Sequence, residues 1–394
     1  MKTIKFYTLG CKVNQYETQA IREYFLNKGF REINNGLTAD VYLINTCTVT
    51  HKADAEALSL IRRFRRENPK SKIIVTGCLT KFDSKKISST APRISIIKNK
   101  DRIMSKCVCD FKGHTRAFLK IQDGCNNRCA YCKVPLVRGK SKSRPLTVVV
   151  KEAKLLVKNG FKEIVLTGIC LGAYGKDLKK QANLVSVIGA LEKIEGLLRI
   201  RLSSIEAGGV TNVLIEKMKH SKKLCHHLHI PVQSGDNDIL KKMNRRYTRE
   251  DYLLLIKRLK KEIPDIGITT DVLVGFPGEN EENFQNTLDL IKEIMPLKVH
   301  AFPYSERVGT LAASNGEVLL KPAVLHSRMK RLNTISDDCA QLFRNNHLGK
   351  EVEVLIEARS KLNPNLWEGY AGNYLKAGVI SESDLLNVLL KTSL

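Results

Sequence analysis

The sequence predicts an α/β protein with a parallel-sheet domain first, a partial (βα)6 barrel second and a small β module last. Three observations indicate this order. Short apolar strands alternate with amphipathic helices over residues 1–105, the alternation resumes over residues 115–330 after a polar linker, and strand-like patterns without helices occupy residues 347–394. Strands that alternate with helices are typical of parallel sheets, so the first two domains are assigned to that class.

The first domain follows a βαβαβ pattern. Strands are expected at residues 2–10, 40–46 and 71–77, and helices at 16–30 and 52–68. The strand DVYLINT is a nearly continuous apolar run, as a sheet covered on both faces requires. The helices carry apolar residues at three- and four-residue spacing, which lets one face of each pack on the sheet. We therefore expect a doubly wound, Rossmann-like sheet.

The second domain shows the same alternation over about two hundred residues, which favours a partial barrel over a complete one. Helical patterns such as VVVKEAKLLVKNG lie between its strands. The six expected strands lie at 117–122, 163–168, 198–204, 226–232, 266–276 and 298–304.

The net charge and the hydropathy of the chain indicate which classes of partner it can bind. The chain carries 66 Lys and Arg against 40 Asp and Glu, a formal net charge of +26. Such an excess predicts a polyanion partner, nucleic acid before a membrane surface. No apolar run approaches the roughly eighteen residues that span a bilayer, so we expect a cytoplasmic protein without membrane contact. Its eleven cysteines are then reduced and free to bind metal.

Three of these cysteines lie in one loop. Cys125, Cys129 and Cys132 form a C-x3-C-x2-C pattern directly after the first barrel strand, at the rim where barrel active sites gather. A closed zinc site needs a fourth ligand, but His114 and Cys109 lie upstream across a strand. Three thiolates instead fit an iron–sulfur cluster with one iron open to substrate.

Three further cysteines each follow a predicted strand of the first domain. They are Cys11, Cys47 and Cys78. Because the carboxyl ends of parallel strands share one edge of the sheet, residues far apart in sequence can meet there. A small buried hydrophobe is the alternative use for any one of them. Their common register predicts a second three-thiolate cluster site.

The cysteine motifs carry a family resemblance. The CNNRCAYC loop resembles the radical S-adenosylmethionine (SAM) superfamily, and the motifs of residues 9–310 together resemble the radical-SAM methylthiotransferases. TLGCKVNQYE is most similar to the branch acting on N6-threonylcarbamoyladenosine next to the anticodon of tRNA. The isopentenyladenosine and ribosomal-protein aspartate branches are similar but differ around Cys11. The tail resembles the TRAM module, a small β-barrel that holds RNA.

This resemblance implies two four-iron, four-sulfur (4Fe-4S) clusters. The loop triad would hold the cluster that cleaves SAM, and the sheet-edge triad would hold an auxiliary cluster that presents sulfur to the adenine ring. A second SAM would supply the methyl group. The implied partners are tRNA and an electron donor such as flavodoxin or ferredoxin, and we expect a monomer. An Fe–S scaffold that binds RNA without turnover remains the non-enzymatic alternative.

Beyond the cluster ligands no catalytic residue is assigned. Glu206, Gln233 and Asp271 each end a barrel strand, where polar groups can bind the ribose or methionine end of SAM. The resemblance predicts Arg where His226 stands and a polar residue where Cys170 stands.

The tail is expected to bind RNA. Its aromatic residues Trp367, Tyr370 and Tyr374 could stack on bases, and Lys350 and Lys376 could meet phosphates. The alternative, weighed equally, is that these three rings pack in the hydrophobic core of the β module.

Overall fold

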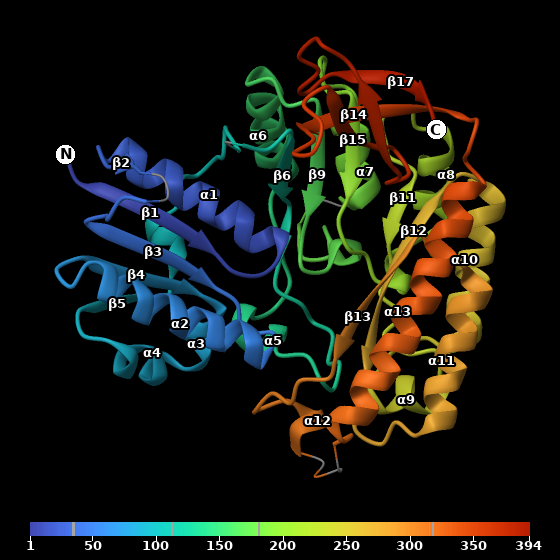
Figure 1. Ribbon diagram of the computed structural model, residues 1–394, viewed down its shortest axis with the longest axis horizontal. Helices are drawn as coiled ribbons and strands as arrows, with labels where there is room; N and C mark the ends of the chain where they lie inside the picture. The colour runs from blue at the N-terminus through green and yellow to red at the C-terminus, as the bar shows by residue number, and fades with distance from the viewer. Residues whose placement is uncertain (34–35, 112, 180–181, 315, 317–318) are drawn as a thin grey trace.

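The computed structural model describes residues 1–394 except 34–35, 112, 180–181, 315 and 317–318. Figure 1 shows a parallel sheet (blue) beside a half-open barrel, with an antiparallel sheet (red) over one end of the barrel strands. The predicted fold class is confirmed in all three parts. Within the described residues, no helix is long and apolar enough to cross a membrane.

The first sheet is entirely parallel, with strand order β2-β1-β3-β4-β5. Its strands are β1 (Thr3–Thr8), β2 (Arg31–Glu32), β3 (Val41–Thr46), β4 (Lys72–Gly77) and β5 (Ile94–Ile97). The alternation of side chains along β3 explains why both faces are apolar. Tyr42 and Ile44 belong to the core on one face, whereas Val41 and Leu43 belong to the core on the other.

Helices cover the two faces of this sheet separately. The core around Tyr42 includes apolar residues of α2 (His51–Glu67), and the core around Val41 includes Ile21 and Phe25 of α1 (Lys12–Asn27). Shorter helices complete the domain: α3 (Cys78–Phe82), α4 (Ser84–Thr90) and the 3-10 turn η1 (Lys100–Ile103). The sheet is therefore doubly wound, as predicted.

The barrel consists of two parallel three-stranded sheets, in the orders β10-β9-β6 and β11-β12-β13. A single bridge between Ile200 and Leu224 connects them. The six strands are β6 (Arg116–Lys120), β9 (Glu163–Thr167), β10 (Arg199–Leu202), β11 (His227–His229), β12 (Gly267–Val274) and β13 (Lys298–Pro303). The partial barrel expected from the chain length is confirmed.

Helices surround the barrel, and the long α13 runs along its outer side in Figure 1. They are α5 (Val134–Arg138), α6 (Leu146–Lys158), α7 (Leu184–Glu192), α8 (Asn212–His220), α9 (Asn237–Lys242), α10 (Arg249–Glu262), α11 (Glu281–Ile294), α12 (Leu311–Ser314) and α13 (Pro322–Asn345). Short elements near the rim are the hairpin β7 (Gln122–Asp123) and β8 (Lys142–Ser143), and the turns η2 (Leu171–Ala173) and η3 (Ala207–Gly209).

One hydrophobic core connects the barrel to the first domain. Tyr16 and Ala20 of α1 pack with the residues of β6, β9 and their helices, while Ile21 and Phe25 of the same helix face the first sheet. Because α1 contributes apolar side chains to both cores, it fixes the first domain against the barrel.

The C-terminal sheet is antiparallel, in the order β16-β15-β14-β17. Its strands are β14 (Glu351–Arg359), β15 (Leu366–Ala371), β16 (Lys376–Ile380) and β17 (Leu389–Ser393). The sheet docks on the amino-terminal ends of the barrel strands. There Arg199 donates hydrogen bonds to the carbonyls of Tyr370 and Glu353, and Arg201 donates to those of Ala371 and Gly372.

The docking is close. A Cβ atom at Gly267, the first residue of β12, would lie 2.0 Å from the carbonyl oxygen of Asn373. Only a residue without a side chain allows the tail to approach this strand.

Candidate active site

The three cysteines of the first domain lie at the carboxyl edge of its sheet, as predicted. Cys11 caps the amino end of α1, Cys47 directly follows β3, and Cys78 is the first residue of α3 directly after β4. All three line one cavity of about 610 Å³. A Cβ atom at Gly10, whose φ is +101°, would lie 3.1 Å from Cys47 Sγ, so the β1 and β3 loops meet here.

Burial distinguishes these thiols. Cys11 is exposed, whereas Cys47 and Cys78 are buried. Burial raises the pKa of Cys47 to about 11 and also raises that of Cys78. Binding of iron must therefore displace protons from these two thiols, because the thiolate is the ligand form.

The second triad occupies the loop between β7 and α5. Backbone hydrogen bonds shape this loop: Cys125 N donates to Gly139 O at 3.0 Å, and Cys132 N donates to Cys129 O at 3.0 Å. The backbone N–H of Asn127 also points at Cys125 Sγ, 3.4 Å away. Gly124, at φ +68°, allows the loop to turn where a Cβ would meet the carbonyl of Lys140. The loop is thus built to present sulfur atoms in a fixed arrangement.

The thiols of each triad are not packed around a single ion. In the part of the chain that the structure describes, no three His, Cys, Asp or Glu side chains gather closely enough to hold one metal ion. A 4Fe-4S cluster spreads its ligands, since each thiolate binds a different iron. Among the described residues, neither triad therefore forms a closed single-zinc site.

The large cavity connects the first domain to the barrel. Opposite the Cys11 triad it is lined by barrel residues, among them Ser203 directly after β10 and His229 at the end of β11. Asp271 and His300 also line it, but they lie within β12 and β13, so the expectation that Asp271 ends its strand is wrong. A smaller cavity of about 260 Å³ lies beside the cysteine loop and is lined by Cys129, Cys170, Glu206, Arg245 and Tyr247.

The predicted SAM residues separate in the structure. Glu206 lines the smaller cavity and pairs with Arg245. Asp271 lines the larger cavity, where its Oδ1 lies 3.1 Å from Nε2 of His229. Gln233 adopts φ +70° and lies among the lining residues of neither cavity.

Two residues lie beside the cysteine loop without having been predicted to do so. Arg245 Nη1 lies 3.2 Å from Cys129 Sγ and holds Glu206 in place. Its sequence KKMNRRYTRE is rich in cations, which by itself indicates a solvated basic face. Cys170 lies beside Cys125, and its hydrogen bond lowers the pKa of the Cys125 thiol.

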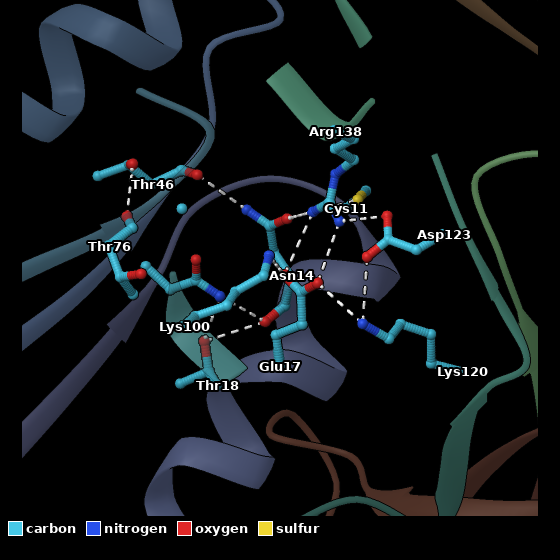
Figure 2. A network of polar contacts seen from close by, with 12 residues as sticks. Cys11, Asn14, Glu17, Thr18, Thr46, Thr76, Lys100, Lys120, Asp123 and Arg138 are labelled. Carbon is cyan, nitrogen blue, oxygen red and sulfur yellow. Dashed lines mark hydrogen bonds and ion pairs between the residues drawn. The ribbon is translucent and has the colours of Figure 1, made fainter. Parts of the chain in front are cut away.

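A buried ionic network lies beside Cys11 (Figure 2). Glu17 of α1 is fully buried and accepts from Lys120 Nζ at 3.1 Å and Arg138 Nη1 at 3.0 Å. The ammonium group of Lys100 forms a third ion pair with the Glu17 carboxylate. Burial raises the pKa of the Glu17 carboxyl, but Lys100, Arg138 and Lys120 outweigh burial and hold it well below the usual 4.5. Asp123 pairs with the same Arg138 at 2.9 Å.

The tail aromatics differ in exposure: Trp367 is buried, whereas Tyr370 and Tyr374 are partly exposed. Trp367 is 4% exposed and packs in the core of the module, with its Nε1 donating to Ser381 O. Tyr374 stacks on His227 at 4.5 Å between ring centroids, and Tyr370 lies beside Arg116. Trp367 thus serves the module core, which is the alternative use that the sequence offered for these rings.

The two tail lysines remain at the surface. Lys350 is exposed at the start of the module, and Lys376 is exposed but pairs with Glu368 at 2.8 Å. His226, outside the cavities that hold the triads, pairs with Asp265 at 2.9 Å.

Comparison with known proteins agrees with the site. The radical SAM superfamily matches residues 119–291, and the uncharacterized protein family UPF0004 matches residues 3–98. The threonylcarbamoyladenosine tRNA methylthiotransferase MtaB of Bacillus subtilis (strain 168) is 39% identical over all of this chain and 94% of its own length. The chain belongs to the radical-SAM tRNA methylthiotransferases.

Other members of this family are similar over most of their length. MtaB of Chlamydia pneumoniae is 37% identical and aligns with 90% of this chain and 87% of its own. The tRNA-2-methylthio-N(6)-dimethylallyladenosine synthase of Clostridium tetani is 35% identical over 92% of this chain and 87% of its own. Methylthiotransferases of this family use SAM and iron–sulfur clusters, which the two triads fit.

Solved structures of radical-SAM enzymes share the fold. The methyltransferase TsrM of Kitasatospora setae, with cobalamin and a 4Fe-4S cluster bound, aligns with a TM-score of 0.57 at 12% identity over 85% of each chain. The cobalamin-dependent enzyme OxsB aligns with a TM-score of 0.54 at 15% identity over 87% of this chain and 56% of its own.

Proposed function

We propose that this methylthiotransferase converts N6-threonylcarbamoyladenosine next to the anticodon of tRNA to its 2-methylthio derivative. The observation that carries the proposal is the cavity of about 610 Å³, which brings the Cys11, Cys47 and Cys78 triad opposite the open ends of the barrel strands. The relatives named for this substrate are 36–39% identical. The net charge of +26 suits a tRNA substrate.

The two triads have separate roles in this proposal. Cys125, Cys129 and Cys132 hold the cluster that binds and cleaves SAM, and Cys11, Cys47 and Cys78 hold the auxiliary cluster. A cluster held by Cys125, Cys129 and Cys132 would supply one-electron reduction of SAM, and a cluster held by Cys11, Cys47 and Cys78 would supply sulfur. An adenine C–H bond is too weakly acidic for a side-chain base, which is why the reaction calls for a radical.

Protein side chains hold the reactants around these clusters. Arg245 donates to Cys129 Sγ and to Glu206, so it orients a ligand thiolate and a cavity carboxylate together. Glu206 can then accept from the ribose or amino group of SAM in the smaller cavity. Asp271, oriented by His229, faces the larger cavity, where the base would enter.

The three parts of the chain divide the work. Residues 1–105 carry the auxiliary cluster, residues 115–330 bind and cleave SAM, and residues 347–394 hold tRNA through surface cations such as Lys350. An electron donor such as flavodoxin or ferredoxin reduces the first cluster. The protein acts as a cytoplasmic monomer.

Two triple substitutions test the roles. Alanine at Cys125, Cys129 and Cys132 should reduce iron from about eight to about four per chain and abolish SAM cleavage. Alanine at Cys11, Cys47 and Cys78 should also remove about four irons but preserve release of 5′-deoxyadenosine while abolishing sulfur insertion. Identical behaviour of the two variants would contradict the proposal.

Mass spectrometry of tRNA nucleosides tests the substrate. Cells that lack this gene should lose the 2-methylthio form of N6-threonylcarbamoyladenosine and regain it when the gene is restored. A purified, reconstituted protein that binds tRNA but never cleaves SAM would instead identify the non-enzymatic scaffold.

A further inference from the structure

Lys12 is a cation without an assigned partner in the large cavity. It directly follows Cys11, begins α1 and lines the cavity at intermediate exposure. Among the described residues, no hydrogen bond or ion pair involves its ammonium group. A charged group held away from bulk water without a counter-ion is costly, so the site calls for an anion.

Arg138 and Asp271, which line the same cavity, already have ionic partners. Arg138 pairs with Glu17 at 3.0 Å and with Asp123 at 2.9 Å. Asp271 lies 3.1 Å from His229, so its carboxylate is also occupied. Lys133 also lacks an ion pair among the described residues, but it is 3% exposed and its ammonium group is covered by the ring of Phe82. Lys12, at intermediate exposure, is therefore the more accessible of the two unpaired cations that line this cavity, within the residues described.

The charged groups around Lys12 do not supply it with a counter-ion. The nearest cations are Arg116 and Arg201, and the nearest acidic groups are the Cys11 thiol and the Tyr374 hydroxyl. The carboxylates of this region are paired with the arginines: Glu163 with Arg201 at 2.6 Å, and Glu357 with Arg116 at 2.8 Å. Among the described residues, the ammonium group of Lys12 is therefore left without a carboxylate partner.

We infer that Lys12 recognises the carboxylate of the threonylcarbamoyl group and so selects this modified adenosine over one with an uncharged N6 substituent. The inference rests on the proposed function and deepens it. A threonylcarbamoyl group ends in a carboxylate, whereas an apolar substituent or a free amino group carries no negative charge. A carboxylate beside Lys12 forms a charge-assisted hydrogen bond, and an apolar group there leaves the cation unpaired.

A matched pair of RNA ligands isolates this contact. The first is an anticodon stem-loop with N6-threonylcarbamoyladenosine, and the second is the same RNA with the threonine carboxylate converted to a carboxamide. Dissociation constants are measured by fluorescence anisotropy with the full-length, cluster-loaded protein. The wild type should bind the acid roughly tenfold to a hundredfold more tightly than the amide.

Substitutions at Lys12 should change this ratio specifically. Lys12→Gln should bring it close to one, and Lys12→Arg, which keeps the charge, should retain a preference for the acid. Lys28→Gln is the control, because it removes the same charge from the exposed end of the same helix. That variant should keep the wild-type ratio.

Three results would overturn the inference. They are a wild type without preference for the acid, a Lys12→Gln variant that keeps the full preference, and one that weakens acid and amide equally. The last would place Lys12 beside a feature that both ligands share, such as the auxiliary cluster. Methylthiolation is scored separately, so a protein that prefers the acid but does not modify it contradicts only the proposed function.

Discussion

Arg138 Nη1 lies 3.0 Å from Glu17 Oε1, and both side chains are buried. Glu17 is on the helix that begins one residue after Cys11, and Arg138 ends the short helix that begins two residues after Cys132. The ion pair therefore ties the supports of the two cysteine triads together across the boundary between the first domain and the barrel.

Substitution of Glu17 should destabilise the protein strongly. Glu17→Gln leaves Lys100, Lys120 and Arg138 buried with less compensating charge, which is expected to cost about 3–5 kcal/mol. Glu32→Gln is the matched control, because its pair with Arg22 is about a quarter exposed and should contribute less than about 1 kcal/mol. Urea unfolding of the two variants measures the difference, and equal losses would contradict the role of the network.

The same carboxylate predicts an acid limit of stability. The pKa of Glu17 in the folded protein lies well below its usual 4.5 because the three cations outweigh burial. A depressed pKa gives stability that is complete above the unfolded value and is lost as pH falls toward the folded value. The stability difference between wild type and Glu17→Gln should therefore be constant above about pH 5 and shrink below about pH 4.5. A difference that persists unchanged at about pH 3 would refute this assignment.

Gly267 should be required for docking of the tail. Gly267→Ala places a Cβ 2.0 Å from the backbone carbonyl of Asn373, which cannot move without separating the two parts. We expect a loss of about 1–3 kcal/mol and faster proteolysis after the barrel. Gly189→Ala, in α7, meets no atom within 4 Å and should be neutral or slightly stabilising. Similar proteolysis of both variants would argue against this contact.

Exposed lysines beside the cysteine loop should contact tRNA phosphates. Lys140 and Lys142 are exposed, and the loop that carries them is hydrogen-bonded to Asn126 through Ser141. Replacing both with Gln should reduce the slope of log affinity against log salt by roughly 0.7–0.9 for each phosphate that is no longer neutralised, and the iron content should not change.

The control for this experiment uses lysines that already have partners. Lys219 and Lys257 are exposed but pair with Glu262 and Glu293, each within 2.8 Å. Their double replacement by Gln should leave the salt slope near that of the wild type. An equal change in both double variants would mean that only net charge matters.

The positions predicted from the sequence and those in the structure agree most closely for residues that directly follow a strand. Cys11, Cys47 and Cys78 were placed at one sheet edge because parallel strands deliver their carboxyl ends to the same side. That argument needs only the strand positions, which apolar runs such as VYLINT reveal locally. The C-x3-C-x2-C loop is likewise a local pattern, and the order of strands and helices predicted both parallel domains.

Contacts between distant segments could not be predicted in this way. The partners of Glu17 come from residues 83, 103 and 121 positions away in the chain. Arg245 approaches Cys129 from 116 positions away, which its basic local sequence does not indicate. Periodicity reports which face of an element is apolar, but it does not report which other element covers that face.

The sequence by itself determined the fold class, both cysteine triads and the polyanionic character of the partner, because each follows from local patterns or from total charge. Only the tertiary structure decided that Trp367 belongs to the module core and that Tyr374 covers His227 at the end of the barrel. It also decided that Lys12 enters the shared cavity, where the described residues offer it no ion pair. The use of an aromatic ring or a lysine depends on which surfaces meet in three dimensions, and burial against another segment outweighs the intrinsic preference of the side chain.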